Sequence, residues 1–373
     1  MKKSDFKYPH LFAPIQLGNV LFRNRIFASP TGYQNLNGDG YLNDGAAAYY
    51  GRKAMGGAAS VATFEGIVDG ELGRGGATHI ALDTPNIDRG ISRIAYGISQ
   101  YGAVATLELQ HTGMFANRDL SFFGAEAKGI AYGPVECECA GRKIRPMTEE
   151  IIERTIQKYI DAALLAKKCG FGMVLVHAGH GWMLHQFLSP ITNTRTDKWG
   201  GPDIENRSRL LLSIVDGIHK ACGAGFPVEV RISGSECYDG GYDIENGIAI
   251  ARQLDGHADL IHVSAGNHEV EEVFAVTHPS MFLEDGCNVH LAAEIKKHVN
   301  TPVATIGALS DPELMEDILA SGKADIVELG RELLADPDFP IQDPGTGHED
   351  KARKCMRCLS CFSSELTNGE PYC

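Results

Sequence analysis

Short runs of apolar and β-branched residues recur along the chain, and most of them are separated by segments with helical periodicity. Each run is of strand length, whereas the segments between them repeat apolar residues every three to four positions. The runs predict eight strands, at 25–28, 60–65, 103–110, 173–177, 228–232, 260–263, 302–306 and 325–329. The clearest helical patterns cover 148–169, 206–222, 244–254, 289–299 and 312–321. Alternating strands and helices indicate a parallel sheet.

Eight strand and helix units close most naturally into a (β/α)8 TIM barrel, which is an α/β fold. A doubly wound sheet is the alternative, and it would be expected to carry a glycine-rich dinucleotide fingerprint after its first strand. The segment after Phe27 instead reads SPTGYQNLNG. Thr148 before one helix and Asp311-Pro312 before another are typical helix starts. We therefore predict the barrel.

Two segments interrupt the strand and helix rhythm. The stretch 133–146 alternates around Ala140-Gly141, which predicts a hairpin over the barrel mouth. The stretch PDFPIQDPGTGHEDKARK is rich in proline, glycine and charge, and it indicates the exit from the barrel. We expect a barrel domain at 1–340 and a C-terminal cysteine-cluster extension at 341–373.

The net charge of the chain limits the classes of partner that it is expected to bind. The formal net charge is -14, which disfavours binding to nucleic acid or to anionic membrane surfaces. No signal-peptide core and no run of about 18 apolar residues is present, so we expect a cytoplasmic protein. Homo-oligomer formation is left open.

Four of the ten cysteines lie in the last nineteen residues, at Cys355, Cys358, Cys361 and Cys373. Their spacing is C-x2-C-x2-C-x11-C. Three thiolates two residues apart can face one inorganic core, which a fourth can complete. An iron–sulfur cluster and a structural zinc ion are both compatible with four cysteines.

Polar residues follow nearly every predicted strand, where the active sites of α/β barrels lie. Gly307-Ala308 and Gly330-Arg331 follow strands seven and eight, and they could offer backbone N–H groups and one fixed cation to a phosphate. Tight turns are the alternative reason for these glycines. The remaining strand ends carry Ser29-Pro30-Thr31, Glu65-Gly66, Gln110-His111, His177 to His180, Arg231 and Ser264 to His268.

His177 and His180 lie three residues apart after strand four, so in a helical turn they would project to the same side. Two N–H donors aimed at one carbonyl would stabilise a developing enolate, as an oxyanion hole does. A structural pair of buried histidines and a zinc site are the other interpretations.

Matching stretches spread over nearly the whole chain resemble the old yellow enzyme family, most closely its 2,4-dienoyl-CoA reductase and enoate reductase branch. These stretches are LFAPIQLGNVLFRNRI, YYGRKAMGG, LELQHTGM, VHAGHGWMLHQFLSPITNTRTDKWGG, IENRSRLLL, VEVRIS, TIGALSDPE and ELGRELLADPDF. The resemblance implies an FMN cofactor, whose phosphate would meet Gly307, Ala308, Gly330 and Arg331. It also implies flavin contacts from Pro30, Thr31, Gly66, Gln110 and Arg231, although Arg231 could instead form an ion pair inside the barrel.

The resemblance further implies an ene-reductase in which His177 and His180 hold the carbonyl of an enoate, enone or enoyl thioester. Relatives often have a tyrosine proton donor where this chain has Trp182, and an indole N–H is no acid. His268 matches a histidine that the dienoyl-CoA reductase branch uses in the loop after strand six. We therefore expect His268 to be the proton donor.

In the same branch a [4Fe-4S] cluster passes electrons to FMN from a following FAD and NAD(P)H domain, and no such domain is found in this chain. A separate flavoprotein or a further domain would supply the electrons. Two other functions remain open at this point. One is an amine dehydrogenase of the trimethylamine dehydrogenase type, and the other is a zinc-stapled barrel that binds a ligand without turnover.

Overall fold

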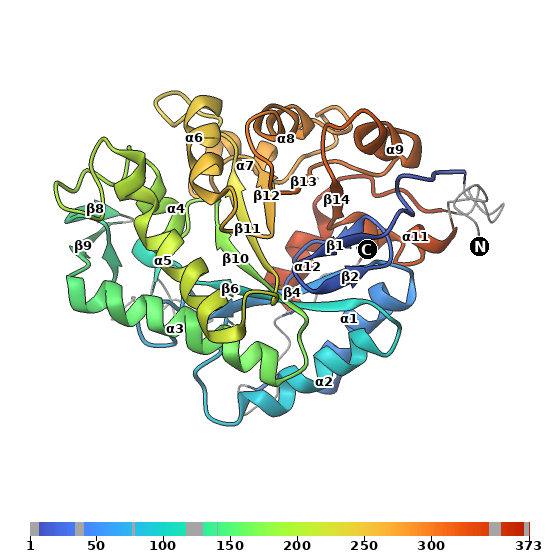
Figure 1. The fold of residues 1–373 in the computed structure, drawn as a ribbon, viewed down its shortest axis with the longest axis horizontal. Coiled ribbons are helices and arrows are strands. Elements are labelled where there is room, and N and C mark those ends of the chain that lie inside the picture. Colours follow the sequence, from blue (N-terminus) through green and yellow to red (C-terminus); the bar gives the residue numbers. More distant parts are fainter. Residues whose placement is uncertain are drawn as a thin grey trace.

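Eight parallel strands close into a barrel, as the sequence predicts (Figure 1). The computed structural model describes residues 7–33, 41–76, 79–116, 130–139, 141–342, 352–368 and 373. Strand β3 pairs with both β4 and β14, so the sheet has no open edge there. The barrel strands are β3 (Ile26–Ala28), β4 (Ser60–Ile67), β6 (Val104–Gln110), β10 (Met173–Ala178), β11 (Val228–Ser233), β12 (Leu260–Ser264), β13 (Val303–Ile306) and β14 (Ile326–Leu329).

The alternation of residues along β11 shows how the barrel acquires a polar interior. Val228, Val230 and Ile232 belong to the hydrophobic core that the surrounding helices cover. Successive side chains of a strand point to opposite faces, so Glu229 and Arg231 point into the barrel. Arg231 lies opposite His177 of the neighbouring strand β10. The strands therefore bury apolar residues outward and carry titratable residues inward.

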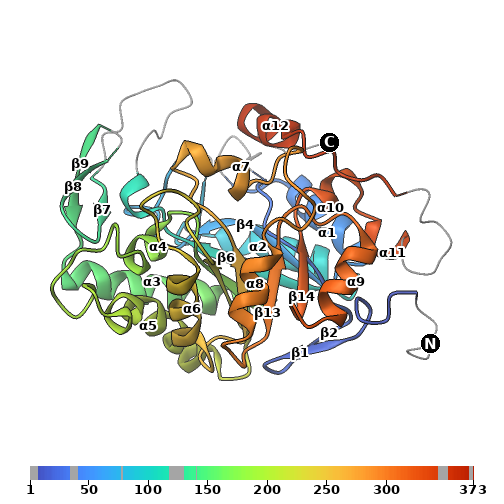
Figure 2. The ribbon, with the colours of Figure 1, turned by 90° about the horizontal axis from the view of Figure 1, so that it is seen from above.

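Helices cover the outside of the barrel (Figures 1 and 2). All five helices predicted from periodicity are present, with bounds that differ by a few residues. Thr148 accepts a hydrogen bond from the backbone N–H of Ile151, and Asp311 caps the last of these helices with Pro312 at its start. The outer helices are α1 (Asp44–Met55), α2 (Ile87–Ser99), α3 (Glu149–Lys168), α5 (Ile204–Cys222), α6 (Ile244–Leu254), α8 (Val289–Lys296) and α9 (Pro312–Ala320).

The two ends of the barrel differ. The hairpin of β1 (Ile15–Leu17) and β2 (Val20–Phe22) covers the end where the strands begin. There Leu17 and Phe22 pack with Met173, Leu260 and Ile326, which lie at or next to the first positions of their strands. That end is apolar and closed, so the functional side is the end where the strands finish.

The predicted hairpin is present at that second end. Strand β8 (Cys137–Cys139) pairs with β9 (Arg142–Pro146) in antiparallel register, and β7 (Tyr132–Gly133) joins β9. Ile144 packs on Met114, which follows β6 in the short helix η1 (Gly113–Phe115). The hairpin therefore lies beside the barrel mouth.

The C-terminal segment also lies at the mouth. After β14 come α10 (Glu332–Ala335) and α11 (Phe339–Gln342), and later α12 (Ser360–Asn368). Phe362 of α12 contacts Phe274 of α7 (Phe274–Thr277) with ring centroids 5.6 Å apart. Figure 2 shows α7 and α12 at the same end of the barrel. The division at residue 340 remains a prediction.

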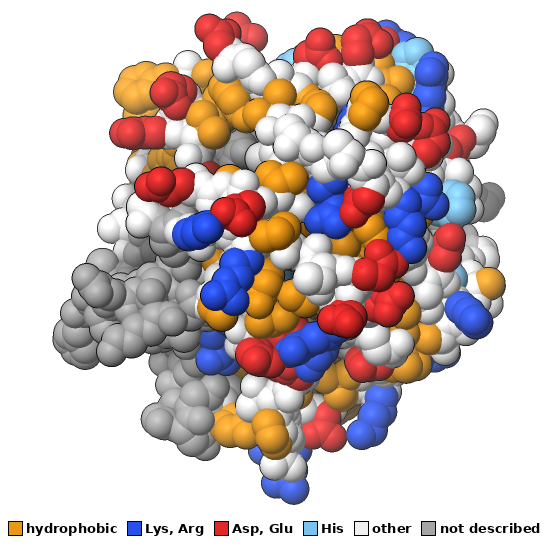
Figure 3. Space-filling view, turned by 90° about the vertical axis from the view of Figure 1, so that its left-hand side faces the viewer, with side chains coloured by type: hydrophobic (Ala, Val, Ile, Leu, Met, Phe, Trp, Pro, Cys, Tyr) orange, Lys and Arg blue, Asp and Glu red, His pale blue; other side chains and the backbone are white. Residues whose placement is uncertain are grey.

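Two features of the described residues concern possible partners. None of their helices combines the length and apolar character that crossing a membrane requires. On the face shown in Figure 3, acidic and basic side chains are interspersed and form no continuous basic patch.

Candidate active site at the barrel mouth

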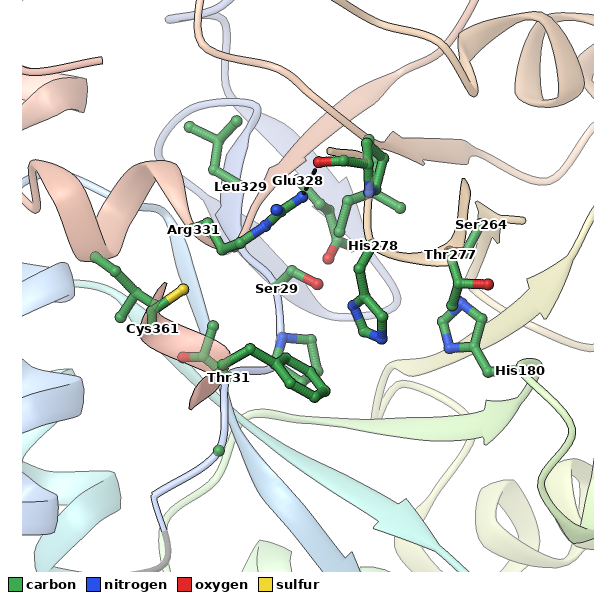
Figure 4. A pocket seen from close by; sticks show the side chains of 18 of the residues that line it. Ser29, Thr31, His180, Ser264, Thr277, His278, Glu328, Leu329, Arg331 and Cys361 are labelled. Atoms are coloured by element: carbon green, nitrogen blue, oxygen red, sulfur yellow. Dashed lines mark hydrogen bonds between the residues drawn. The ribbon is translucent and has the colours of Figure 1, made fainter. Parts of the chain in front are cut away.

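A cavity of ≈ 400 Å³ opens at the carboxyl ends of the strands (Figure 4). Its size falls within the ~300–1,000 Å³ range of ligand pockets. Residues from β10, β11, β12 and β14 line it, together with the loops that follow β3 and β13. The cysteine segment closes one side through Cys355 and Cys361. The predicted residues that line it are Pro30, Thr31, His177, His180, Arg231, His268, Gly307, Ala308, Gly330, Arg331, Cys355 and Cys361.

The predicted phosphate residues meet in one corner of this cavity. Gly307 has φ +127°, and a Cβ there would come within 2.8 Å of the Asn288 side chain, so the position requires glycine. Arg331 donates from Nη2 to the carbonyl oxygen of Pro279 at 2.7 Å, whereas its buried Nη1 has no hydrogen-bond partner. Burial lowers the pKa of Arg331 from its usual value. An unpartnered donor of a buried guanidinium is a fitting contact for a phosphate.

Only some of the residues predicted to contact the flavin ring line the cavity. Thr31 lines the cavity, and its hydroxyl contacts the Lys53 ammonium and the Tyr49 hydroxyl. Arg231 lines the cavity, and its Nε atom has no partner. Gln110 and Gly66 are not among the lining residues, although the Nε2 atom of Gln110 is buried without a partner. These free donors fit FMN, which needs hydrogen bonds at its pyrimidine edge.

Gly66 has a structural reason for lacking a side chain. A Cβ at this position of β4 would lie 2.6 Å from the carbonyl oxygen of Glu108 and 2.8 Å from Leu82. The close approach of β4 and β6 thus accounts for the glycine, while its predicted contact with the flavin stays a prediction.

His177 and His180 form the centre of a buried hydrogen-bonded chain. The Nε2 atom of His177 lies 3.0 Å from Nδ1 of His180, and Nε2 of His180 lies 2.7 Å from Oγ of Ser264. At the other end, Nδ1 of His177 lies 2.9 Å from Oε1 of Gln110 and 2.8 Å from Oε1 of Glu108. The network therefore links the buried Glu108 carboxyl group to the Ser264 hydroxyl, and Glu108, both histidines and Ser264 all line the cavity.

The backbone that brings the two rings together is not the helical turn assumed from their spacing. His177 belongs to strand β10, and His180 adopts a left-handed conformation with φ +59°. His180 also bridges to Asn267 in the loop after β12. The expectation of a helical turn is therefore wrong, although the two rings do converge, because an extended strand followed by a left-handed residue folds the chain back.

Burial determines the protonation states of the side chains in this hydrogen-bonded network. It lowers the pKa of His177 and His180 well below the usual value, with Arg231 contributing repulsion. It raises the pKa of Glu108 to about 8. Near neutral pH both imidazoles are therefore neutral and Glu108 is largely protonated.

His268, the predicted proton donor, lies next to the histidine pair. Its ring stacks on that of His180 with centroids 4.9 Å apart, and Trp182 contacts it at 5.6 Å. Its Nε2 atom is buried without a partner, and its backbone N–H donates to the carbonyl oxygen of His180 at 3.0 Å. Burial and the neighbouring His278 keep its pKa well below the usual value. His268 is thus placed to touch a bound ligand.

Several lining residues were missed by the sequence reasoning. Glu108 and Glu328 occupy inward positions of their strands, so the alternation in LELQ and VELG carried a signal for them. His278 lies within 4.6 Å of His268 between ring centroids, but it follows a short helix and no pattern marked it.

The cysteine segment is folded in an unusual backbone conformation. Arg357 and Leu359 have φ of 55° and 63°, and they flank the predicted ligand Cys358. The backbone N–H of Arg357 donates to Sγ of Cys355 at 3.4 Å. Cys358 and Cys373 are exposed. Within the described residues, the three-ligand set whose atoms lie within 4.8 Å of one another is Glu229, His262 and Glu328, not the cysteines.

Comparison with known proteins agrees with the barrel fold. The chain is 36% identical over 361 residues to the NADH oxidase of Thermoanaerobacter brockii, covering 96% of this chain and 54% of that protein. It is 31% identical over 376 residues to the cinnamate reductase of Clostridium sporogenes, with coverages of 95% and 55%. A solved 2-naphthoyl-CoA reductase complex has a TM-score of 0.87 at 28% identity, with coverages of 98% and 56%. The chain therefore spans about half the length of these relatives.

A family model described as NADH:flavin oxidoreductase / NADH oxidase matches residues 10–343. This match and the relatives above 30% identity confirm the resemblance to old yellow enzyme. The chain belongs to the NADH:flavin oxidoreductase / NADH oxidase family of FMN-dependent oxidoreductases.

Proposed function

We propose that the protein is an ene-reductase, which reduces the C=C bond of an α,β-unsaturated carbonyl compound or thioester. The observation that carries this proposal is the pair His177 and His180, which meets Ser264 and Arg231 in one cavity. The names of two relatives agree, because one is a cinnamate reductase and another was solved with 2-naphthoyl-CoA. The substrate class is thus an enoate, an enone or an enoyl thioester.

FMN, when bound, supplies the hydride for the β-carbon. Phosphate binding falls to Arg331 with the backbone of Gly307, Ala308 and Gly330, and the ring contacts fall to Pro30, Thr31, Gly66, Gln110 and Arg231. His177 and His180 are neutral because of their burial, so each offers one N–H and no charge. Such donors stabilise the negative charge that develops on a carbonyl oxygen.

His268 is the proposed proton donor for the α-carbon. It stacks against His180 in the same cavity, so one ligand can touch both rings. Trp182 fills the position where relatives often have a tyrosine, and its buried Nε1 atom has no partner. An indole cannot deliver a proton, so His268 is the proposed donor for that step and water is the alternative.

We further propose that Cys355, Cys358, Cys361 and Cys373 hold a [4Fe-4S] cluster that delivers electrons. Two left-handed non-glycine residues in one loop cost about 1–2 kcal/mol each, so the segment needs a compensating interaction. The N–H to sulfur hydrogen bond at Cys355 is of the kind that tunes such clusters. The electrons would come from NAD(P)H through an FAD-containing domain or a partner flavoprotein.

The test is anaerobic turnover of the purified protein, supplied with FMN and a one-electron donor, against enoates, enones, enoyl-CoA esters and amines. Reduction of an unsaturated carbonyl compound supports the proposal. Oxidation of amines without any C=C reduction would contradict it and favour an amine dehydrogenase. A colourless protein that contains zinc and no flavin would favour the ligand-binding barrel.

A matched pair of variants tests the route of the electrons. Cys358→Ser removes an exposed ligand, so it should abolish the cluster absorption and electron entry while FMN remains bound. Cys237→Ser removes an exposed cysteine outside the segment and should change neither. Full cluster absorption in Cys358→Ser would rule out the ligand assignment.

A further inference from the structure

The barrel interior contains a second group of ligand-type side chains, which the proposed reaction does not use. Glu229 of β11, His262 of β12 and Glu328 of β14 are all at most 2% exposed. The Nδ1 atom of His262 lies 2.8 Å from Oε1 of Glu229 and 3.1 Å from Oε1 of Glu328. Three strands therefore direct one nitrogen and two oxygens to a common point.

The charges around this point are unbalanced. Glu108 is buried in the same interior, so three carboxyl groups face the guanidinium of Arg231. Lys53 and Arg207, the other buried lysine and arginine side chains of the described residues, contact Thr31 and backbone carbonyl oxygens instead. Burying carboxylates without compensation costs several kcal/mol per ion. The interior needs further positive charge, whether from protons or from a cation.

The contacts of Glu328 indicate that the barrel interior is arranged for a cation rather than for protons. Its Oε1 atom has no hydrogen-bond partner, although it lies 3.1 Å from the ring nitrogen of His262. Neighbouring ligands of a six-coordinate metal ion with bonds of about 2.1 Å lie about 3.0 Å apart, whereas those of a tetrahedral zinc ion lie about 3.4 Å apart. The separations of 2.8 and 3.1 Å are therefore short enough for a shared ion, and the shorter one is a direct hydrogen bond between His262 and Glu229 that an ion would replace.

We propose that Glu229, His262 and Glu328 bind one divalent transition-metal ion in the barrel interior. An imidazole nitrogen with two carboxylate oxygens suits Zn²⁺, Fe²⁺ or Mn²⁺ better than Ca²⁺ or Mg²⁺. The site is separate from the cysteine segment, and it does not depend on the proposed ene-reductase activity.

The route to the site follows from the lining of the cavity. Glu328 lines the mouth cavity, and Figure 4 shows it among the lining residues, whereas Glu229 and His262 do not line it. An ion therefore enters from the mouth, past Glu328. A ligand that fills the mouth covers this entrance, so the ion binds first and FMN retains it. Once bound, the ion links β11, β12 and β14.

The direct test is crystallography of the full chain loaded with Zn²⁺ and then FMN, with anomalous data on both sides of the zinc absorption edge. A zinc peak between the three side chains is the expected result. Absence of a zinc peak there, in crystals that show zinc or iron only at the cysteines, would overturn the proposal.

Variants provide an independent measurement in solution. In a Cys355→Ser/Cys358→Ser background, His262→Asn and Glu328→Gln should each weaken Zn²⁺ binding by about 100-fold or more. His219→Asn is the matched control, because His219 pairs with a single carboxylate, Asp259, at 2.9 Å. It should keep the parent affinity. Equal Zn²⁺ affinity in the parent and in a folded Glu328→Gln protein would refute the site.

The proposed order of binding, with the ion before FMN, can be tested in a third experiment. Zn²⁺ release to a chelator should be at least about ten times slower from the FMN-bound protein than from the flavin-free protein. Equal release rates would contradict entry through the mouth.

Discussion

His177 and His180 hydrogen-bond each other, with 3.0 Å between Nε2 of the first ring and Nδ1 of the second. Ser264 and the Glu108 and Gln110 side chains occupy the remaining ring nitrogens. A carbonyl oxygen can be held only if one of these hydrogen bonds is exchanged for it. The pair is therefore a preformed network that ligand binding rearranges.

We predict that His177→Ala lowers kcat and kcat/KM for an unsaturated carbonyl substrate by about 10²–10³-fold, since one donor to the developing oxyanion is lost. Steady-state kinetics under anaerobic conditions measure this. His290→Ala, at an exposed histidine of α8, should keep the parent values. An unchanged kcat in His177→Ala would exclude the histidine from the reaction.

The role of His268 is separable from that of the pair. His268→Ala should slow the reoxidation of pre-reduced FMN by substrate by about 10²–10⁴-fold, the usual contribution of a positioned acid, while FMN stays bound. Stopped-flow absorbance follows the reaction. If His268→Ala reoxidises at the parent rate and Trp182→Tyr speeds it, water is the donor in the parent protein.

Arg331 should matter for FMN retention. A charge-assisted contact to phosphate contributes about 1.5–3 kcal/mol, so Arg331→Ala should raise the Kd for FMN by roughly ten- to a hundredfold. Fluorescence titration of the flavin-free protein gives the Kd. Arg209→Ala changes an exposed arginine of α5 and serves as control. Full flavin retention in dilute Arg331→Ala would disprove the phosphate contact.

The raised pKa of Glu108 predicts a pH dependence of stability in the flavin-free protein. Burial raises this pKa from 4.5 to about 8, so between these values the folded state binds more protons than the unfolded state. The contribution of Glu108 to the free energy of unfolding therefore falls as pH rises, by up to about 1.4 kcal/mol per pH unit. Glu108→Gln removes this loss, so its stability relative to the parent should increase from pH 5 to pH 8.

Urea unfolding at pH 5, 6.5 and 8 measures that difference. Glu138→Gln, at an exposed carboxylate of β8, should track the parent at every pH. A difference between Glu108→Gln and the parent that stays constant with pH would show that Glu108 is ionised throughout.

Local patterns in the sequence were sufficient for the eight barrel strands, for five of the seven described outer helices and for the set of polar strand ends. Strand and helix periodicities follow from backbone geometry, and a residue such as Arg231 is directed inward by its alternation with Val230 and Ile232. The cysteine spacing likewise identified a candidate metal or cluster segment before its position was known.

Tertiary structure alone decided which of these residues meet. Gln110 and Glu108 share one face of β6, yet only Glu108 lines the cavity, because depth along a barrel strand depends on how the other strands close around it. The left-handed turn at His180 depends on its bridge to Asn267 from another strand's loop. Glu229, His262 and Glu328 lie far apart in the sequence, and barrel closure brings them within bonding distance of a common point.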